Sequence, residues 1–332
     1  MRRALVALLL VVAALTGCSS HATTMPGMRP EPTHVDRQVV IPAAAKTMPA
    51  TWTEVFAIPY GPGREQLGTS QGGDRGGAVM YGPEYGAPAP DGSWWFLDVG
   101  KHRLAHYDAT GAFLDAAAIP DRLSTDFPWQ LPHVLANGTL VAFRVVGSDR
   151  GGMLRLSDGV LDEVPLTAAF TPSYDDGTLL YGTVGRKLMS LDPLTGVLRP
   201  VSGYWLPSGG GFTLTDDFDK GQVQFGADTA DVSLTTVTAS GATAHIGMQF
   251  RAGADGSVHL FLPGYGDDHP SRQLVGYVSI SPSGEVSTVE PLATPFSHAA
   301  SGSAAQLVIA PGESSPMLVY VMDDGVHVYR RE

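Results

Sequence analysis

The chain has 332 residues, of which 43% are hydrophobic and only 16% charged, so it carries enough apolar side chains to bury a core. This composition excludes a chain that is disordered throughout. The formal net charge of -12 argues against nucleic acid as a partner, because phosphate-backbone binding requires clustered Lys and Arg. The 40 glycines and 25 prolines favour turn-rich β structure over long helices.

Residues 1–17 have the layout of a secretory signal peptide. Two arginines precede an apolar run from Ala4 to Leu15, which is too short to cross about 30 Å of hydrocarbon as a helix. Cys18, the single cysteine of the chain, follows directly. We therefore predict that residues 1–17 direct export and are then removed.

Leu15-Thr16-Gly17-Cys18 resembles the lipobox of bacterial lipoproteins. The resemblance implies cleavage before Cys18 and attachment of acyl chains such as palmitate to that residue. Two or three acyl chains give a stable anchor, so the implied partner is the lipid bilayer and the implied location is the outward side of the cell membrane. The alternative is an ordinary signal peptide followed by a chance cysteine.

Residues 18–50 are rich in Ser, Thr, Pro and Ala and show no sustained hydrophobic period. This composition predicts a flexible linker that joins the lipidated Cys18 to a folded domain over residues 51–332.

A repeated pair of glycine turns organises residues 51–332. The first turn of the pair occurs as Asp91-Gly92, Asn137-Gly138, Asp176-Gly177, Lys220-Gly221 and Asp255-Gly256. The second occurs as Thr110-Gly111, Asp158-Gly159, Thr195-Gly196, Ser240-Gly241 and Ser283-Gly284. A run with strand character follows each first turn, and another precedes each second turn. Spacings of 37 to 48 residues between the second-turn glycines are typical of a β-propeller with four short strands per blade.

The last unit of the repeat is incomplete. After the fifth unit, the chain offers only three further strand-like runs before Glu332, and residues 52–60 form an apolar run ahead of the first unit. Pairing that run with the last unit would close the ring and remove two exposed sheet edges. We therefore predict an all-β, six-bladed β-propeller in which an N-terminal strand closes the last blade.

Residues 91–114, DGSWWFLDVGKHRLAHYDATGAFL, resemble a blade of the NHL-repeat and TolB-like six-bladed propellers. The segment GPEYGAPAPDGSWWFLD also resembles the gluconolactonase-like propellers, in which a glutamate of the first inner strand binds a metal. That second resemblance implies a metal-binding role for Glu84. The motifs that supply the remaining ligands of that family have no counterpart in this chain, and one carboxylate does not hold a hard cation.

Aromatic, charged and polar residues gather in the longer loops and connectors, which we expect on the ring face opposite the glycine turns. This predicted ligand or partner face consists of Trp129, Tyr204, Trp205, Tyr265, Asp267, Asp268, His269 and Arg272. Exposed aromatic residues beside Arg often mark recognition surfaces. The alternative is that these residues belong to solvated loops.

The pattern Gly68-Thr69-Ser70-Gln71-Gly72 matches the nucleophile elbow of hydrolases, but the glycine-rich residues that follow do not predict the required helix. We therefore expect no catalytic residue and no cofactor. The sequence predicts a membrane-anchored lipoprotein whose propeller binds an envelope protein or a glycan without catalysis. The alternative function is a metal-dependent lactonase or lyase of the gluconolactonase-like type.

Overall fold

The structure is a computed structural model in which almost every regular element is a β-strand. It describes residues 34–72, 79–81, 85–120, 129–144, 151–205, 211–217, 220–226, 234–240, 242–245, 249–266, 269–293, 305–322 and 324–332. Within these residues one short 3-10 helix, η1 (Val99–Lys101), is present. No helix of the described part is long and apolar enough to cross a bilayer. The predicted all-β class is confirmed.

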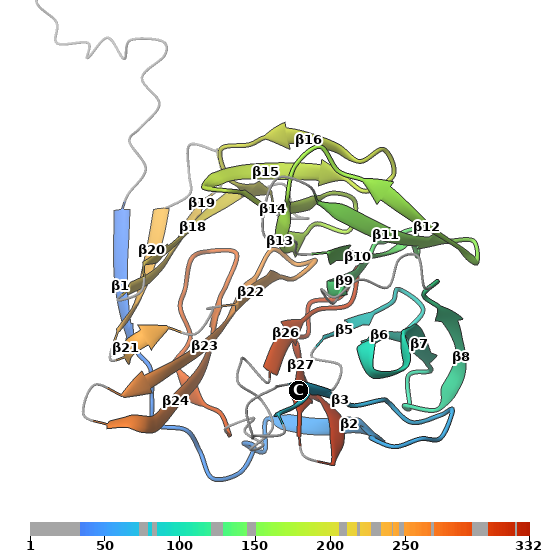
Figure 1. The fold of residues 1–332 in the computed structure, drawn as a ribbon. Coiled ribbons are helices and arrows are strands. Elements are labelled where there is room, and N and C mark those ends of the chain that lie inside the picture. The colour runs from blue at the N-terminus through green and yellow to red at the C-terminus, as the bar shows by residue number, and fades with distance from the viewer. Residues whose placement is uncertain are drawn as a thin grey trace, which may run out of the picture.

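Five blades surround a common axis (Figure 1). Blade I comprises β5 (Gly86–Pro88), β6 (Trp94–Asp98), β7 (Arg103–Tyr107) and β8 (Phe113–Ala118). Blade II comprises β9 (Trp129–Val134), β10 (Leu140–Arg144), β11 (Gly152–Ser157) and β12 (Val160–Pro165). Blade III comprises β13 (Thr171–Asp175), β14 (Leu180–Val184), β15 (Lys187–Asp192) and β16 (Val197–Pro200).

The remaining two blades come from the C-terminal part of the chain, and blade V also takes one strand from the N-terminal side. Blade IV comprises β22 (Gln249–Ala252), β23 (Val258–Gly266), β24 (His269–Ile280) and β25 (Glu290–Pro291), and β21 (Ala242–His245) pairs with the far end of β23. Blade V comprises β26 (Ala305–Val308), β27 (Met317–Val321), β28 (Gly325–Arg331) and β2 (Trp52–Pro59). Two further strands, β3 (Ser70–Gly72) and β4 (Val79–Tyr81), pair only with each other among the described strands.

A further sheet, which we call the outer sheet, is not a blade of the ring. It contains β17 (Tyr204–Trp205), β18 (Gly211–Asp217), β19 (Lys220–Gly226), β20 (Leu234–Ser240) and β1 (His34–Val40). Blade III, which precedes these strands in the chain, packs directly on blade IV, which follows them. β13 lies against β22, and Arg251 Nη1 of β22 donates a hydrogen bond to the Ser173 carbonyl of β13 over 2.9 Å.

The prediction of six blades is therefore wrong, and the ring has five. The hydrophobic core agrees, because its five clusters each join two neighbouring blades. The unit marked by Lys220-Gly221 forms the outer sheet, where Gly221 lies within β19 opposite Asp216. The glycine turns of this hairpin match those of a blade. Counting the sequence repeats therefore gives one blade more than the ring contains.

One glycine per blade fixes the turn between the inner strand and the second strand. These glycines are Gly92, Gly138, Gly177, Gly256 and Gly312, with φ between 82° and 85°. This left-handed conformation is unfavourable for residues with a Cβ atom, which explains the repeated Asp-Gly and Asn-Gly pairs. The fifth turn contains Pro311-Gly312, which the sequence repeat had not identified as a blade turn.

The predicted closure of the last blade is confirmed. β2 pairs antiparallel with β28, so the outermost strand of blade V comes from the N-terminal side of the chain. The first repeat, residues 91–111, also forms the second and third strands of blade I, as expected. Closure leaves blade V without the second glycine turn, because its third and fourth strands are not consecutive in the chain.

Residues 34–50, which we expected to be part of a flexible linker, lie along the domain. β1 pairs in parallel with β20, and Val39 and Ile41 are buried in the core between blades III and IV. The Ala45 amide then donates a hydrogen bond to the Leu292 carbonyl at the edge of blade IV. Residues 1–17, Cys18 and the linker as far as residue 33 lie outside the described residues.

A buried ion pair in blade I holds the connection between blades V and I. Arg103 Nε lies 2.8 Å from Asp98 Oδ2, and the Asp98 side chain is fully buried. The two Nη atoms of Arg103 donate to the carbonyls of Arg64 and Gln66, while Asp98 Oδ1 accepts from the Gly68 amide. One Asp–Arg pair therefore satisfies several backbone groups of the loop between β2 and β3.

Replacing Arg103 by Ala should lower the free energy of unfolding by about 3 kcal/mol, because the buried Asp98 carboxylate would lose its cation. The matched control is Arg155→Ala in blade II, whose partner Asp162 has a side chain that is 42% exposed. That variant should lose about 1 kcal/mol or less. Urea denaturation of both variants measures the difference, and equal losses would contradict the structural role of the Asp98 pair.

Candidate binding site between blades IV and V

Polar side chains join neighbouring inner strands near the ring axis. Gln306 accepts from the Gly86 amide across blades V and I, and Gln249 bonds the backbone of β26 across blades IV and V. His133 Nδ1 lies 2.7 Å from Asp175 Oδ2 across blades II and III. The cavity among these strands measures only about 20 Å³, which is room for about one water molecule.

Asp175 is the charged acceptor of this axial network. Burial, the largest single influence, raises the pKa of Asp175, but the hydrogen bond from His133 and the electrostatic interactions with His133 and Arg251 together lower it by more. Its pKa therefore lies below the ordinary value, and the carboxylate is ionised at neutral pH. Within the described residues, no group of three or more His, Cys, Asp or Glu side chains is placed to bind a metal ion.

A larger pocket opens at the junction of blades IV and V, and we call it the interblade pocket. Its volume is about 500 Å³, and eleven of its lining residues have polar or charged side chains. Serines predominate, namely Ser257, Ser279, Ser281, Ser287, Ser314 and Ser315. A volume of this size is within the range of small-molecule sites.

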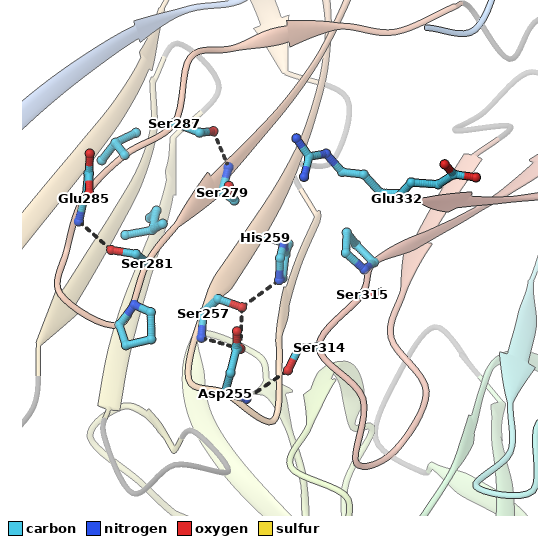
Figure 2. Close-up of a pocket in the computed structure, with 15 residues that line it drawn as sticks. Asp255, Ser257, His259, Ser279, Ser281, Glu285, Ser287, Ser314, Ser315 and Glu332 are labelled. Carbon is cyan, nitrogen blue, oxygen red and sulfur yellow. Dashed lines mark hydrogen bonds between the residues drawn. The ribbon is translucent and has the colours of Figure 1, made fainter. Parts of the chain in front are cut away.

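The floor of the interblade pocket is formed by residues at and just after the glycine turn of blade IV. Asp255 Oδ1 accepts from the Ser257 amide at 3.0 Å and from the Ser257 hydroxyl at 2.6 Å. Ser257 Oγ lies 2.8 Å from His259 Nε2, and His259 Nδ1 lies 2.6 Å from the Tyr277 hydroxyl. Figure 2 shows Asp255, Ser257 and His259 connected in this order.

The floor has the residue types of a Ser–His–acid triad but not its connectivity. In such a triad the acid contacts the histidine, whereas here Asp255 contacts Ser257. The same Asp–Ser–His chain recurs in blade I, where Asp91 accepts from Ser93 and Ser93 Oγ lies 2.9 Å from His106 Nε2. Its recurrence at an equivalent turn indicates that the chain stabilises the turn rather than activating a nucleophile.

His259 is neutral at physiological pH. Burial lowers the pKa of His259 to about 4, and the nearby Arg331 charge adds to this effect while Asp255 opposes it. Burial also raises the pKa of Tyr277, so its hydroxyl keeps its proton and can donate to His259 Nδ1. His259 Nε2–H then donates to Ser257, whose own proton goes to Asp255. Every polar group of the floor is satisfied in this arrangement.

The two walls of the interblade pocket come from different blades. On the blade IV side, the hairpin after β24 is held by a hydrogen bond from the Glu285 amide to Ser281 Oγ. On the blade V side, Ser314 Oγ accepts from the Asp255 amide at 3.0 Å. Figure 2 shows Ser281 and Glu285 on one side of His259 and Ser315 on the other.

Arg331 lies at the outer side of the interblade pocket and connects it to the ring closure. Its guanidinium carbon lies 5.0 Å from the centre of the Tyr277 ring, and its Nε donates to Glu290 Oε2. Trp52 of the closing strand donates to the same carboxylate oxygen through Nε1. Trp52 of the closing strand and Arg331 of the pocket therefore share one carboxylate.

The predicted ligand face does not coincide with the interblade pocket. Tyr265, His269 and Arg272 lie in the β23–β24 hairpin, at the end of β23 opposite Ser257. Tyr204 and Trp205 form β17 of the outer sheet, and Trp129 begins β9 of blade II. The structure thus divides the described residues of this face among the β23–β24 hairpin, the outer sheet and blade II, and recognition by this face stays a prediction. Asp267, Asp268 and Glu84 lie outside the described residues.

Sequence reasoning missed the pocket because its residues are small and come from separate turns. Ser257 follows an Asp-Gly turn, and residues 279–287 are rich in serine, but neither pattern is specific to a binding site. The contribution of Ser314, Ser315 and Arg331 depends on which blades are neighbours. A correct blade count was therefore needed to find it.

A family model described as a domain of unknown function, DUF7485, matches residues 50–331. The chain belongs to the DUF7485 family. This match spans all five blades of the DUF7485 ring and begins close to the predicted domain boundary at residue 51. None of the curated proteins compared with the DUF7485 chain matches it.

Solved structures similar to the DUF7485 chain are also β-propeller-type proteins. A putative exported protein from Bacteroides fragilis shares 8% identity at a TM-score of 0.47, covering 90% of this chain and 99% of that one. A putative gluconolactonase shares 13% identity at a TM-score of 0.42, covering 86% of this chain and 96% of that one. Virginiamycin B lyase from Staphylococcus aureus shares 10% identity at a TM-score of 0.41, covering 74% of this chain and 93% of that one. At such low similarity, their activities are not carried over to the DUF7485 chain.

The neutral state of His259 predicts a specific pH dependence of stability. Between its ordinary pKa of 6.5 and its folded pKa of about 4, the unfolded chain binds a proton that the folded chain does not. Stability is therefore complete above pH 6.5 and falls by about 3 kcal/mol as the pH drops to 4. His259→Gln should lose less stability than the wild type between pH 7 and pH 4 in urea titrations.

His327→Gln provides a control in which the expected change of stability with pH has the opposite sign. Burial lowers the pKa of His327, but hydrogen bonds to Glu54 and Asp324 outweigh it, so the pKa is raised. His327 therefore stabilises the fold below pH 6.5 and loses this effect as the pH rises through its folded pKa. The His327→Gln variant should lose more stability than the wild type on acidification. Identical pH profiles for the His259→Gln variant and the wild type would show that His259 is not buried as a neutral group.

Proposed function

We propose that the protein is a lipid-anchored extracytoplasmic recognition module that binds a small polar ligand in the interblade pocket. The observation that carries this proposal is an open pocket of about 500 Å³ that lies between blades IV and V and is lined by six serines. Rigid propeller strands hold both walls, and binding sites are commonly built from loops on such a scaffold. No covalent step is part of the proposal.

The axial lactonase or lyase reading has less support. It needs several carboxylates converging on the axis, whereas the described part of the axis offers only Asp175, which is engaged by His133. Glu84, the residue that the resemblance suggests as a metal ligand, is not among the described residues. Binding between two blades therefore fits the described geometry better than metal chemistry at the axis.

The anchoring part of the proposal rests on residues 1–18 of the sequence. The apolar run and the lipobox-like Leu15-Thr16-Gly17-Cys18 support export followed by acylation of Cys18. An envelope protein or a glycan that carries the polar ligand group remains the expected partner.

Expressed from its full gene in a bacterium fed labelled palmitate, the wild-type protein should be labelled and should sediment with the membrane fraction. Cys18→Ser removes the thiol that receives the lipid, so label and membrane association should both be lost. A Ser20→Ala variant serves as the control next to the cleavage site and should behave as the wild type. Membrane-bound, unlabelled wild-type protein would contradict lipid anchoring through Cys18.

Blocking the interblade pocket should abolish ligand binding without unfolding the protein. Ser315 is exposed and lines the pocket, so Ser315→Trp should fill it. The matched control is Ser283→Trp, because Ser283 is exposed on the hairpin next to the pocket but does not line it. Thermal melts of the detergent-solubilised full-length protein against a library of cationic, neutral and anionic small molecules provide the measurement.

Hits that raise the Tm of the wild type and of Ser283→Trp by several degrees, but not that of Ser315→Trp, would support the pocket. A library in which every hit also stabilises Ser315→Trp would place binding elsewhere and overturn the proposal.

A further inference from the structure

We infer that the interblade pocket selects a small, hydroxyl-bearing cationic ligand, such as an amino sugar, over an anionic one. This inference rests on the proposed function and specifies its ligand class. It depends on three features of the lining: the balance of charges, the engagement of its one arginine, and the hydrogen-bonding capacity of its serines.

Negative charge predominates around the interblade pocket. Asp255, Glu285 and Glu332 contribute three carboxylates to the lining, and all three residues are exposed. Burial raises the pKa of Asp255, but hydrogen bonds from Ser257 and Ser314 lower it by more, so this carboxylate stays ionised. No described residue donates a hydrogen bond to the Glu285 side chain. A ligand ammonium could therefore pair with Glu285 without displacing an internal contact.

Arg331, the only cation of the lining at neutral pH, does not reverse this balance. Its Nε is bound to Glu290, and its guanidinium lies over the Tyr277 ring. Glu290 thus offsets the charge of Arg331 from just behind the pocket. His259 adds no positive charge, because it is neutral above about pH 4. An anionic ligand would meet three carboxylates and one neutralised cation.

The serines suit hydroxyl groups, since a serine hydroxyl can both donate and accept. Ser287 Oγ accepts from the Ser279 amide, and Ser281 Oγ accepts from the Glu285 amide, so each is held in a fixed position by the backbone. Val286, which is partly exposed, adds apolar surface that can pack against the C–H face of a sugar ring. Carboxylates beside fixed hydroxyls form a pattern of acceptors and donors that a polyol complements.

Three sugars that share one pyranose skeleton test the charge preference directly. Glucosamine, glucose and glucuronate should bind the detergent-solubilised full-length protein in that order at pH 6 and low ionic strength, measured by isothermal titration calorimetry. Three carboxylates near the amine should favour glucosamine over glucose by about tenfold. Raising the salt concentration to 0.3 M should reduce this ratio, because exposed charges are screened.

Variants that each remove one negative charge assign the preference to the pocket. Glu285→Gln should weaken glucosamine binding about threefold and leave glucose binding unchanged. Glu163→Gln removes the same charge from β12 in blade II, far from the pocket in the ring, and should leave the glucosamine-to-glucose ratio unchanged.

Glucuronate binding as tightly as glucosamine would overturn the inference, as would the absence of binding by all three sugars. An equal fall in the glucosamine-to-glucose affinity ratio for Glu285→Gln and Glu163→Gln would also overturn the inference. It would show that the selectivity depends on the net charge of the protein and not on the pocket. These outcomes do not decide the proposed function. The thermal melts with Ser315→Trp test it separately, because their small-molecule library contains cationic, neutral and anionic ligands.

Discussion

The packing of five inner strands around one axis constrains the whole molecule. The cavity described among these strands measures about 20 Å³, and polar side chains that line it cross-link the blades. His133 and Asp175 join blades II and III, while Arg251 joins blades III and IV. The described pocket that is large enough for a small ligand lies between blades IV and V.

The interblade pocket arises where the ring is closed. Blade V takes its outer strand from the N-terminal side of the chain, and Trp52 of that strand shares the Glu290 carboxylate with Arg331. Arg331 covers Tyr277, whose hydroxyl in turn orients His259 at the pocket floor. Packing at the junction and the geometry of the pocket floor are thus one network.

Local patterns predicted local structure well, whereas neighbour relations could not be read from them. The turn glycines, the strands of the first repeat and the closing strand followed from backbone preferences and sheet edges. The blade count failed because the hairpin around Lys220-Gly221 has blade-like punctuation but sits in the outer sheet. The pocket was missed for the same reason, since Ser257 and Ser315 meet only when blades IV and V are known to be adjacent.

The closure also determines when the protein can finish folding. Thr53 and Glu332, which are hydrogen-bonded in blade V, are separated by 279 positions in the chain. Contacts of such high sequence separation form slowly, and this one requires the last strand to be present. Before β2 and β28 have paired, blade V has an unpaired strand edge, which is a template for association with other chains. This vulnerable intermediate therefore persists until β28 has formed and β2 has paired with it.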